Sequence, residues 1–196
     1  EHGRIENEFT ITRLADNHFY LLSAAISELR DFDLLNHRIL ETENVTVTNI
    51  TDDWGVLVLA GPRSRDVLSQ LTKTDLRNEQ FRWLTAQTIE VAGIELRALR
   101  VNYVGELGWE LHHPIEMQNY IFDKVMEAGA EFDIKPFGIR AMDSMRLEKS
   151  YRLIPREMSI EYSAFESGLD RFVRFDKEDD FIGKVALAEW QQRGSD

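Results

Sequence analysis

The chain has 196 residues, a length that suits one domain or two closely joined lobes, and 43% of them are hydrophobic, as in folded globular proteins. Acidic residues outnumber basic ones by 35 to 23, so the formal net charge is −12. Because such a surface repels phosphate backbones, we expect no nucleic-acid partner. The absence of cysteine excludes disulfides, thiolate catalysis and cysteine-bound zinc. Apolar runs are far shorter than the roughly 20 residues that cross a bilayer, so we expect no membrane partner.

The N-terminal quarter predicts a hairpin followed by a helix. Residues 9–22 form two strand-like segments that turn at residues 15–18, because Asp and Asn tolerate tight turns. Apolar residues then recur at helical spacing, which predicts an amphipathic helix over roughly residues 24–38. The chain begins with neither Met nor a signal-peptide pattern, and its first strand starts with almost no lead-in. We therefore interpret it as a piece of a longer protein.

The remaining sequence alternates strands and helices. Strands are predicted at residues 45–50, 55–60, 88–91, 94–101 and 109–112, and helices at 62–71, 115–128, 139–150 and 182–191. Gly61-Pro62 is typical of a helix start, since proline at the first helical position loses no hydrogen bond. This order predicts an α+β fold with mixed or antiparallel sheets and helices packed on one side. No long linker interrupts the chain, so we expect one compact unit.

The most informative segment is a glycine-containing turn between two strand-like runs, residues 103–110 (YVGELGWE). Tyr103 and Glu110 flank this turn. An aromatic face beside a carboxylate suits a flat heterocycle with two adjacent N–H donors, because the carboxylate accepts both while the ring stacks. A 2-amino-4-oxopterin is such a ligand. The alternative is an ordinary hairpin in which Tyr103 packs and Glu110 is solvated.

Other motifs favour structural roles. His112 and His113 are adjacent on a predicted strand, so their rings point to opposite faces and cannot easily share a metal ion. The sequence contains no P-loop, no Rossmann glycine pattern and no Ser-His-Asp spacing. We therefore expect neither a metal site nor a flavin bound within this chain.

The pattern Tyr-x-Gly-Glu-x-Gly-aromatic-Glu resembles the signature of the glycine-cleavage T-protein (aminomethyltransferase) folate-binding family. Further matches follow in family order at residues 3–14 (GRIENEFTITRL), 61–68 (GPRSRDVL) and 181–187 (FIGKVAL). Residues 139–152 (IRAMDSMRLEKSYR) are more similar to the tetrahydrofolate-binding part of dimethylglycine and sarcosine dehydrogenases. The resemblance spans nearly the whole chain. It implies a partial T-protein folate-binding domain over residues 1–196, without the family's upstream part and C-terminal β-barrel.

The resemblance also implies the transfer of one carbon from an N-methyl amine to tetrahydrofolate. Glu110 would orient the pterin, Tyr103 would line its pocket, and Glu8 would stabilise a cationic iminium or move a proton. For Glu8 the alternative is a solvated carboxylate. FAD is expected only in a separate upstream domain of the full-length chain, and this piece alone is expected to be inactive. The expected compartment is the cytoplasm, or the mitochondrial matrix in a eukaryote.

Departures from the family pattern concern the substrate side of the site. Met142 stands where T-proteins have an arginine, and Arg140 lies about 200° away around the helix, so it cannot replace it. Ala24 stands where an asparagine is expected, and Glu8 where an aspartate is usual. Arg152 and Arg156 are candidates for the glutamate tail of folate, with surface arginines as the simpler interpretation. Two further functions stay open: a stand-alone aminomethyltransferase or methyltransferase, and a folate-binding module without turnover.

Overall fold

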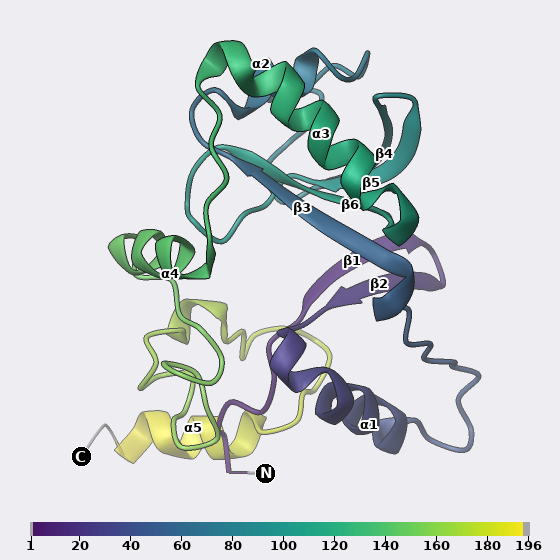
Figure 1. The fold of residues 1–196 in the computed structure, drawn as a ribbon. Coiled ribbons are helices and arrows are strands. Elements are labelled where there is room, and N and C mark those ends of the chain that lie inside the picture. The colour runs from purple at the N-terminus through teal and green to yellow at the C-terminus, as the bar shows by residue number, and fades with distance from the viewer. Residues whose placement is uncertain (1, 194–196) are drawn as a thin grey trace. The chain divides into compact units, whose positions relative to one another are not determined.

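The structure is a computed structural model that describes residues 2–193 (Figure 1). The chain forms two compact units. Unit 1 contains the residues up to Val47 and those from Arg152 onward, and unit 2 is Thr48–Tyr151. The expectation of one compact unit was wrong because unit 1 is assembled from two distant stretches of chain, an arrangement that needs no linker.

A four-stranded antiparallel sheet forms the centre of unit 2 (Figure 1). Its strands are β3 (Trp54–Ala60), β4 (Ala86–Val91), β5 (Ile94–Leu99) and β6 (Gly108–Pro114), and their spatial order is β3-β6-β5-β4. These strands and the α+β class confirm the sequence-based prediction. Residues 45–50, predicted as a further strand, have no regular secondary structure.

The helices of unit 2 are α2 (Ser64–Ser69), α3 (Gln118–Gly129) and α4 (Ile139–Glu148). Helices α2 and α3 pack against each other and on the same face of the sheet (Figure 1). The helix predicted over residues 62–71 is shorter, because regular α-helix begins only at Ser64, after Pro62. Short 3-10 turns occupy Thr51–Asp53, Ile115–Met117 and Ala130–Phe132.

Alternation along the strands separates two faces of this sheet. Side chains on one face, including Leu96, Trp109 and Leu111, enter the hydrophobic core beneath α2 and α3. Residues between them, such as Glu110 and His112, lie on the opposite face, because successive strand residues point to opposite sides. The helix-covered face therefore supplies the core, and the other face carries Glu110 and His112.

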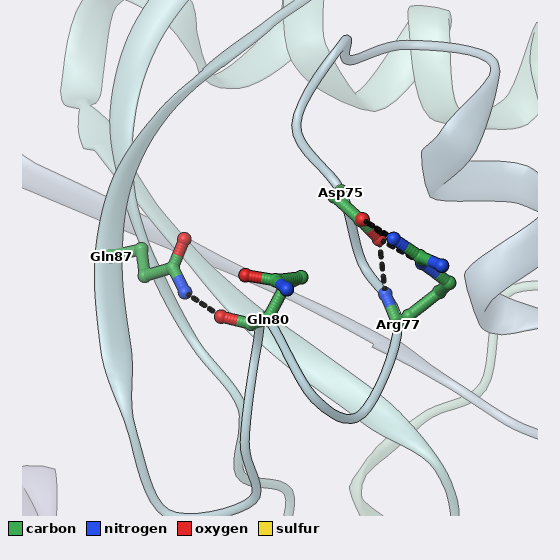
Figure 2. Close-up of polar contacts among 4 residues, drawn as sticks. All are labelled: Asp75, Arg77, Gln80 and Gln87. Carbon is green, nitrogen blue, oxygen red and sulfur yellow. Dashed lines mark hydrogen bonds and ion pairs between the residues drawn. The ribbon is translucent and has the colours of Figure 1, made fainter.

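Polar contacts tie down the long connection between α2 and β4 (Figure 2). The Asp75 carboxylate accepts hydrogen bonds from the backbone N–H of Arg77 at 3.0 Å and from its Nε at 2.9 Å. Gln87 Nε2 donates to the carbonyl oxygen of Gln80 at 2.8 Å. These contacts fix a segment that has no regular secondary structure of its own.

Unit 1 combines a hairpin with two helices. Strands β1 (Thr10–Ala15) and β2 (His18–Leu22) pair antiparallel, and helix α1 (Glu28–Arg38) follows a 3-10 turn at Ala25–Ser27. The predicted hairpin and first helix are thereby confirmed. The C-terminal stretch contributes a 3-10 turn at Asp170–Phe172 and helix α5 (Lys184–Arg193).

Backbone pairing joins the two stretches of unit 1. Arg4 and Ser163 form an antiparallel bridge, and Ile5 N–H donates to the carbonyl oxygen of Tyr162 at 3.0 Å. No helix among residues 2–193 is both long enough and apolar enough to cross a membrane.

Candidate functional site

Steric constraints explain both glycines of the turn between β5 and β6. Gly105 has φ +70°, and a Cβ added there would lie 2.6 Å from Cγ of Lys149. A Cβ on Gly108 would lie 2.6 Å from the carbonyl oxygen of Leu59 on the neighbouring strand β3. The turn conformation therefore needs glycine at one position, and close strand pairing needs it at the other.

The side chain of Asn102 organises the same turn. Its Oδ1 accepts hydrogen bonds from the backbone N–H groups of Val104 at 3.0 Å and Glu106 at 3.3 Å. Its Nδ2 donates to the carbonyl oxygen of Glu106. This local network holds the backbone on both sides of Tyr103.

Tyr103 lies against the chain that leaves α4. Its ring is partly buried, and its centroid is 6.2 Å from that of Tyr151 at an interplanar angle of 42°. Lys149 Nζ is 3.4 Å from Glu106 Oε1, which joins the same two segments by an ion pair. The predicted Tyr103 therefore belongs to an aromatic pair that is assembled across more than 40 residues of sequence.

Glu110 lies in β6, on the sheet face away from α2 and α3. Its cross-strand neighbours are Val58 in β3 and Leu99 in β5. The side chain is 22% exposed, and its Oε2 is 3.3 Å from Nε2 of His112. Glu110 is therefore a mostly buried carboxylate between apolar neighbours, and the alternative of a solvated hairpin glutamate does not describe it.

His112 and His113 point to opposite faces of β6, as predicted, and both are buried. His113 Nδ1 is 2.9 Å from the carbonyl oxygen of Pro114, and His113 lies beside Gly55 and Gln118. Sequence analysis missed the contact between His112 and Glu110. The signal was present in their spacing, because residues i and i+2 of a strand share a face. Among residues 2–193, no three or more His, Asp or Glu side chains converge to hold a metal ion.

The third predicted site residue, Glu8, belongs to unit 1, whereas Tyr103 and Glu110 belong to unit 2. The Glu8 residue is exposed, yet nearby protein atoms remove part of its hydration, and this desolvation raises the pKa of its carboxyl group. A raised pKa makes a carboxyl group a better proton carrier near neutral pH.

Helix α4 contains a buried arginine that sequence analysis did not single out. The Arg146 side chain is fully buried, its Nε donates to Asp143 Oδ1 at 2.7 Å, and its Nη1 donates to the carbonyl oxygen of Tyr151 at 2.8 Å. Arg146 thus holds the backbone that carries Tyr151. Arg140, on the same helix, is exposed.

A cavity of about 540 Å³ lies elsewhere in unit 2, beside β3, the start of α2, α3 and residues 132–142. Its lining is mostly apolar and includes Met142, whereas Tyr103 and Glu110 do not line it. Met142 therefore contributes to an apolar wall and not to the polar group around Glu110.

A family model described as "GCVT N-terminal domain" matches residues 1–177 of the chain. The chain belongs to this family. Human mitochondrial dimethylglycine dehydrogenase is 39% identical over 193 residues, which cover 98% of this chain and 22% of that protein. The aminomethyltransferase of Thermoanaerobacter sp. (strain X514) is 33% identical over 194 residues, covering 98% of this chain and 51% of that protein.

The chain is also similar to a third enzyme and to one solved structure. Mouse mitochondrial sarcosine dehydrogenase is 31% identical over 209 residues, covering 99% of this chain and 23% of that protein. The heterotetrameric sarcosine oxidase from Corynebacterium sp. U-96, in complex with pyrrole 2-carboxylate, has a TM-score of 0.56 at 22% identity, covering 70% of this chain and 69% of that chain. This structural likeness shows the fold. The chain spans about a fifth of the dehydrogenases and about half of the aminomethyltransferase.

Proposed function

We propose that the chain forms part of a tetrahydrofolate site in an enzyme that transfers one carbon from an N-methyl amine. Membership of the GCVT N-terminal domain family supports this proposal, as does the identity to proteins named dimethylglycine dehydrogenase and sarcosine dehydrogenase. FAD would then be held by another part of the full-length protein, and the amine and the folate would be its small-molecule partners.

The observation that carries the proposal is the environment of Glu110. A carboxylate that is 22% exposed and flanked by Val58 and Leu99 has lost part of its hydration, and its polar contact with His112 uses only one oxygen. Such a carboxylate is stabilised when a ligand donates N–H hydrogen bonds to it. The two adjacent N–H donors of a 2-amino-4-oxopterin meet this requirement.

Tyr103 and Tyr151 supply the aromatic surface that a pterin needs. Their rings are already packed at a tilt of 42° with centroids 6.2 Å apart, and Arg146 fixes the backbone of Tyr151. A ring held in place before binding loses little conformational freedom when it stacks on a ligand. These residues fit the pterin end of folate, whereas Met142 gives no positive group for the arginine contact expected in T-proteins.

Bound tetrahydrofolate would supply the two nitrogens that receive the carbon unit. The task of the chain is to orient this acceptor, through Glu110 and Tyr103, and to provide a carboxylate near the cationic amine, a role we propose for Glu8. The raised pKa of Glu8 fits a group that exchanges a proton during transfer.

The test is the affinity of the intact protein for 5-formyltetrahydrofolate, a stable reduced folate, measured by calorimetry. Glu110→Gln keeps the size of the side chain but replaces one acceptor oxygen with an NH2 group. Charge-assisted hydrogen bonds contribute about 1.5–3 kcal/mol each, so the affinity should fall by at least about tenfold.

Glu106→Gln is the matched control for this experiment. Glu106 lies in the same turn, is about half exposed, and makes its ion pair with Lys149 at the surface. Its substitution should leave folate affinity nearly unchanged. Equal affinities of the wild-type and Glu110→Gln proteins would overturn the proposed pterin anchor.

A stand-alone aminomethyltransferase or methyltransferase is the second candidate, favoured by the 33% identity to the Thermoanaerobacter aminomethyltransferase. The absorbance spectrum of the intact protein separates the two, because only the dehydrogenase type carries a flavin. Formation of 5,10-methylenetetrahydrofolate by the intact protein would exclude a module that binds folate without turnover.

A further inference from the structure

We infer that His112 is a positioning residue for Glu110, holding its carboxylate in the orientation that receives the ligand. The inference rests on the proposed function, because it assigns a partner to the group that would anchor the pterin. The two residues share the face of β6 that points away from α2 and α3, and the distance from His112 Nε2 to Glu110 Oε2 is 3.3 Å.

Burial makes the histidine a rigid partner. The side chain of His112 is 1% exposed, whereas that of Glu110 is 22% exposed, so the imidazole is enclosed by protein and the glutamate keeps some access to solvent. A proton on Nε2 lets the ring donate to Oε2. A carboxylate has about four lone-pair sites, so this bond leaves the remaining sites free for two parallel N–H donors of a ligand.

The cross-strand neighbours of Glu110 and His112 do not hold the Glu110 carboxylate in this way. Val58 and Leu99, which flank Glu110 across the sheet, are apolar. Arg97 is the cross-strand neighbour of His112, but its guanidinium stacks over the ring of Trp54 with Cζ 4.3 Å from the ring centroid. Because the terminal torsion of a glutamate is broad, the carboxylate would rotate freely without the contact to His112.

An isosteric pair of variants tests this role in the intact protein. His112→Gln keeps an N–H donor at nearly the same reach, whereas His112→Met has a similar length without a donor. Calorimetric affinity for 5-formyltetrahydrofolate should fall about five- to tenfold in His112→Met and recover to within about twofold of wild type in His112→Gln. Equal losses in the two variants would overturn the inference, because a packing role does not depend on the donor.

Coupling to Glu110 gives a second measurement. In the Glu110→Gln background, His112→Met should cost much less affinity than in the wild type, since the group that it positions is already altered. Fully additive losses would show that His112 acts independently of Glu110. If Glu110→Gln itself leaves the affinity unchanged, the proposed function fails. If Glu110→Gln weakens binding and His112→Met does not, only the positioning role fails.

His113→Met is the matched control, because His113 is the same residue type at the next position, equally buried on the opposite face. It measures how a substitution in β6 affects folate binding through general loss of stability. The affinity of folded His113→Met protein should equal that of wild type. A loss as large as that of His112→Met would contradict the inference.

Discussion

The two units of the chain differ in how much apolar surface they bury. In unit 2, α2 and α3 cover a sheet whose inward side chains, such as Leu96, Trp109 and Leu111, are almost completely inaccessible. In unit 1, the buried hydrophobic side chains among residues 2–193 are Tyr20, Met158 and Leu187. Because the free energy of folding scales with the apolar area removed from water, unit 2 has the larger source of stability of its own.

Unit 1 also exposes apolar side chains on both of its helical segments. Ile26 and Leu29 are 78% and 76% exposed, and Val185 in α5 is 73% exposed. Polar contacts add to the stability that the small core of unit 1 provides, and they include the ion pair between Arg30 and Glu6 at 2.7 Å. Such exposed pairs contribute little individually, so unit 2 is the more stable of the two units and provides the scaffold for Tyr103 and Glu110.

The same substitution in each unit tests this difference most strongly. Leu96→Ala should lower the free energy of unfolding of unit 2 by about 3–5 kcal/mol, because it opens a cavity in a closed core. Leu187→Ala should cost about 2 kcal/mol, the low end for such a change, because a smaller core relaxes around the lost side chain. Chemical denaturation with a spectroscopic probe in each unit measures both effects. Leu29→Ala is the exposed control, and a larger loss for Leu187→Ala than for Leu96→Ala would reverse the comparison.

The pairing of β3 with β6 offers a narrower test of the scaffold. In Gly108→Ala the new Cβ meets the backbone oxygen of Leu59, which cannot move aside without disturbing the strand. We expect a loss of about 1–3 kcal/mol in thermal or chemical unfolding. Gly138→Ala serves as the control because nothing lies within 4 Å of its added Cβ, and its loss should stay below about 1 kcal/mol. Similar losses in both variants would show that the close approach at Gly108 is unimportant.

The smallest effect should come from the surface pair of Asp75 and Arg77 in unit 2. Hydrogen bonds from the Arg77 side chain and backbone hold the pKa of Asp75 at about 2, below its ordinary value of 3.8. Since the pKa is lower in the folded state, the pair stabilises unit 2 above about pH 4, and this contribution disappears as the pH falls towards 2. An NMR titration should show the midpoint of the Asp75 carboxyl rising in Arg77→Gln, because the side-chain hydrogen bond is lost. The backbone N–H at position 77 is retained, so the midpoint should stay below the ordinary value of 3.8. An unchanged midpoint in that variant would contradict the assigned cause, and the matched Lys135→Gln variant should not move it.

Local patterns predicted much of the fold correctly where each element carries its own signal. The turn at residues 15–18, the strand over residues 94–101 and the helix over residues 115–128 are predicted from nearby residues. The structure confirms them, with the strand at Ile94–Leu99 and the helix at Gln118–Gly129. Residues 45–50 show that strand-like composition alone does not make a strand. They have strand-like composition, but β3 pairs with β6 and residues 45–50 pair with no strand, so Val45 is left 55% exposed. Strand propensity measures how well a side chain fits a pleated surface, and it has no effect where no neighbouring strand forms.

Residues 103–110 were enough to indicate the family and the turn that carries Tyr103 and Glu110, because a short run of glycines, aromatic residues and acids encodes both. The order of strand-like and helical patterns along the chain indicated the α+β class. The folded chain was needed to establish that Glu110 is mostly buried, that His112 contacts its carboxylate, and that Tyr103 packs against Tyr151. The division into two units could not be predicted from local sequence patterns either, because unit 1 is built from two distant stretches of chain. The reason is physical: a local pattern fixes backbone conformation, whereas burial and the contacts of a side chain depend on residues that folding brings from elsewhere in the chain.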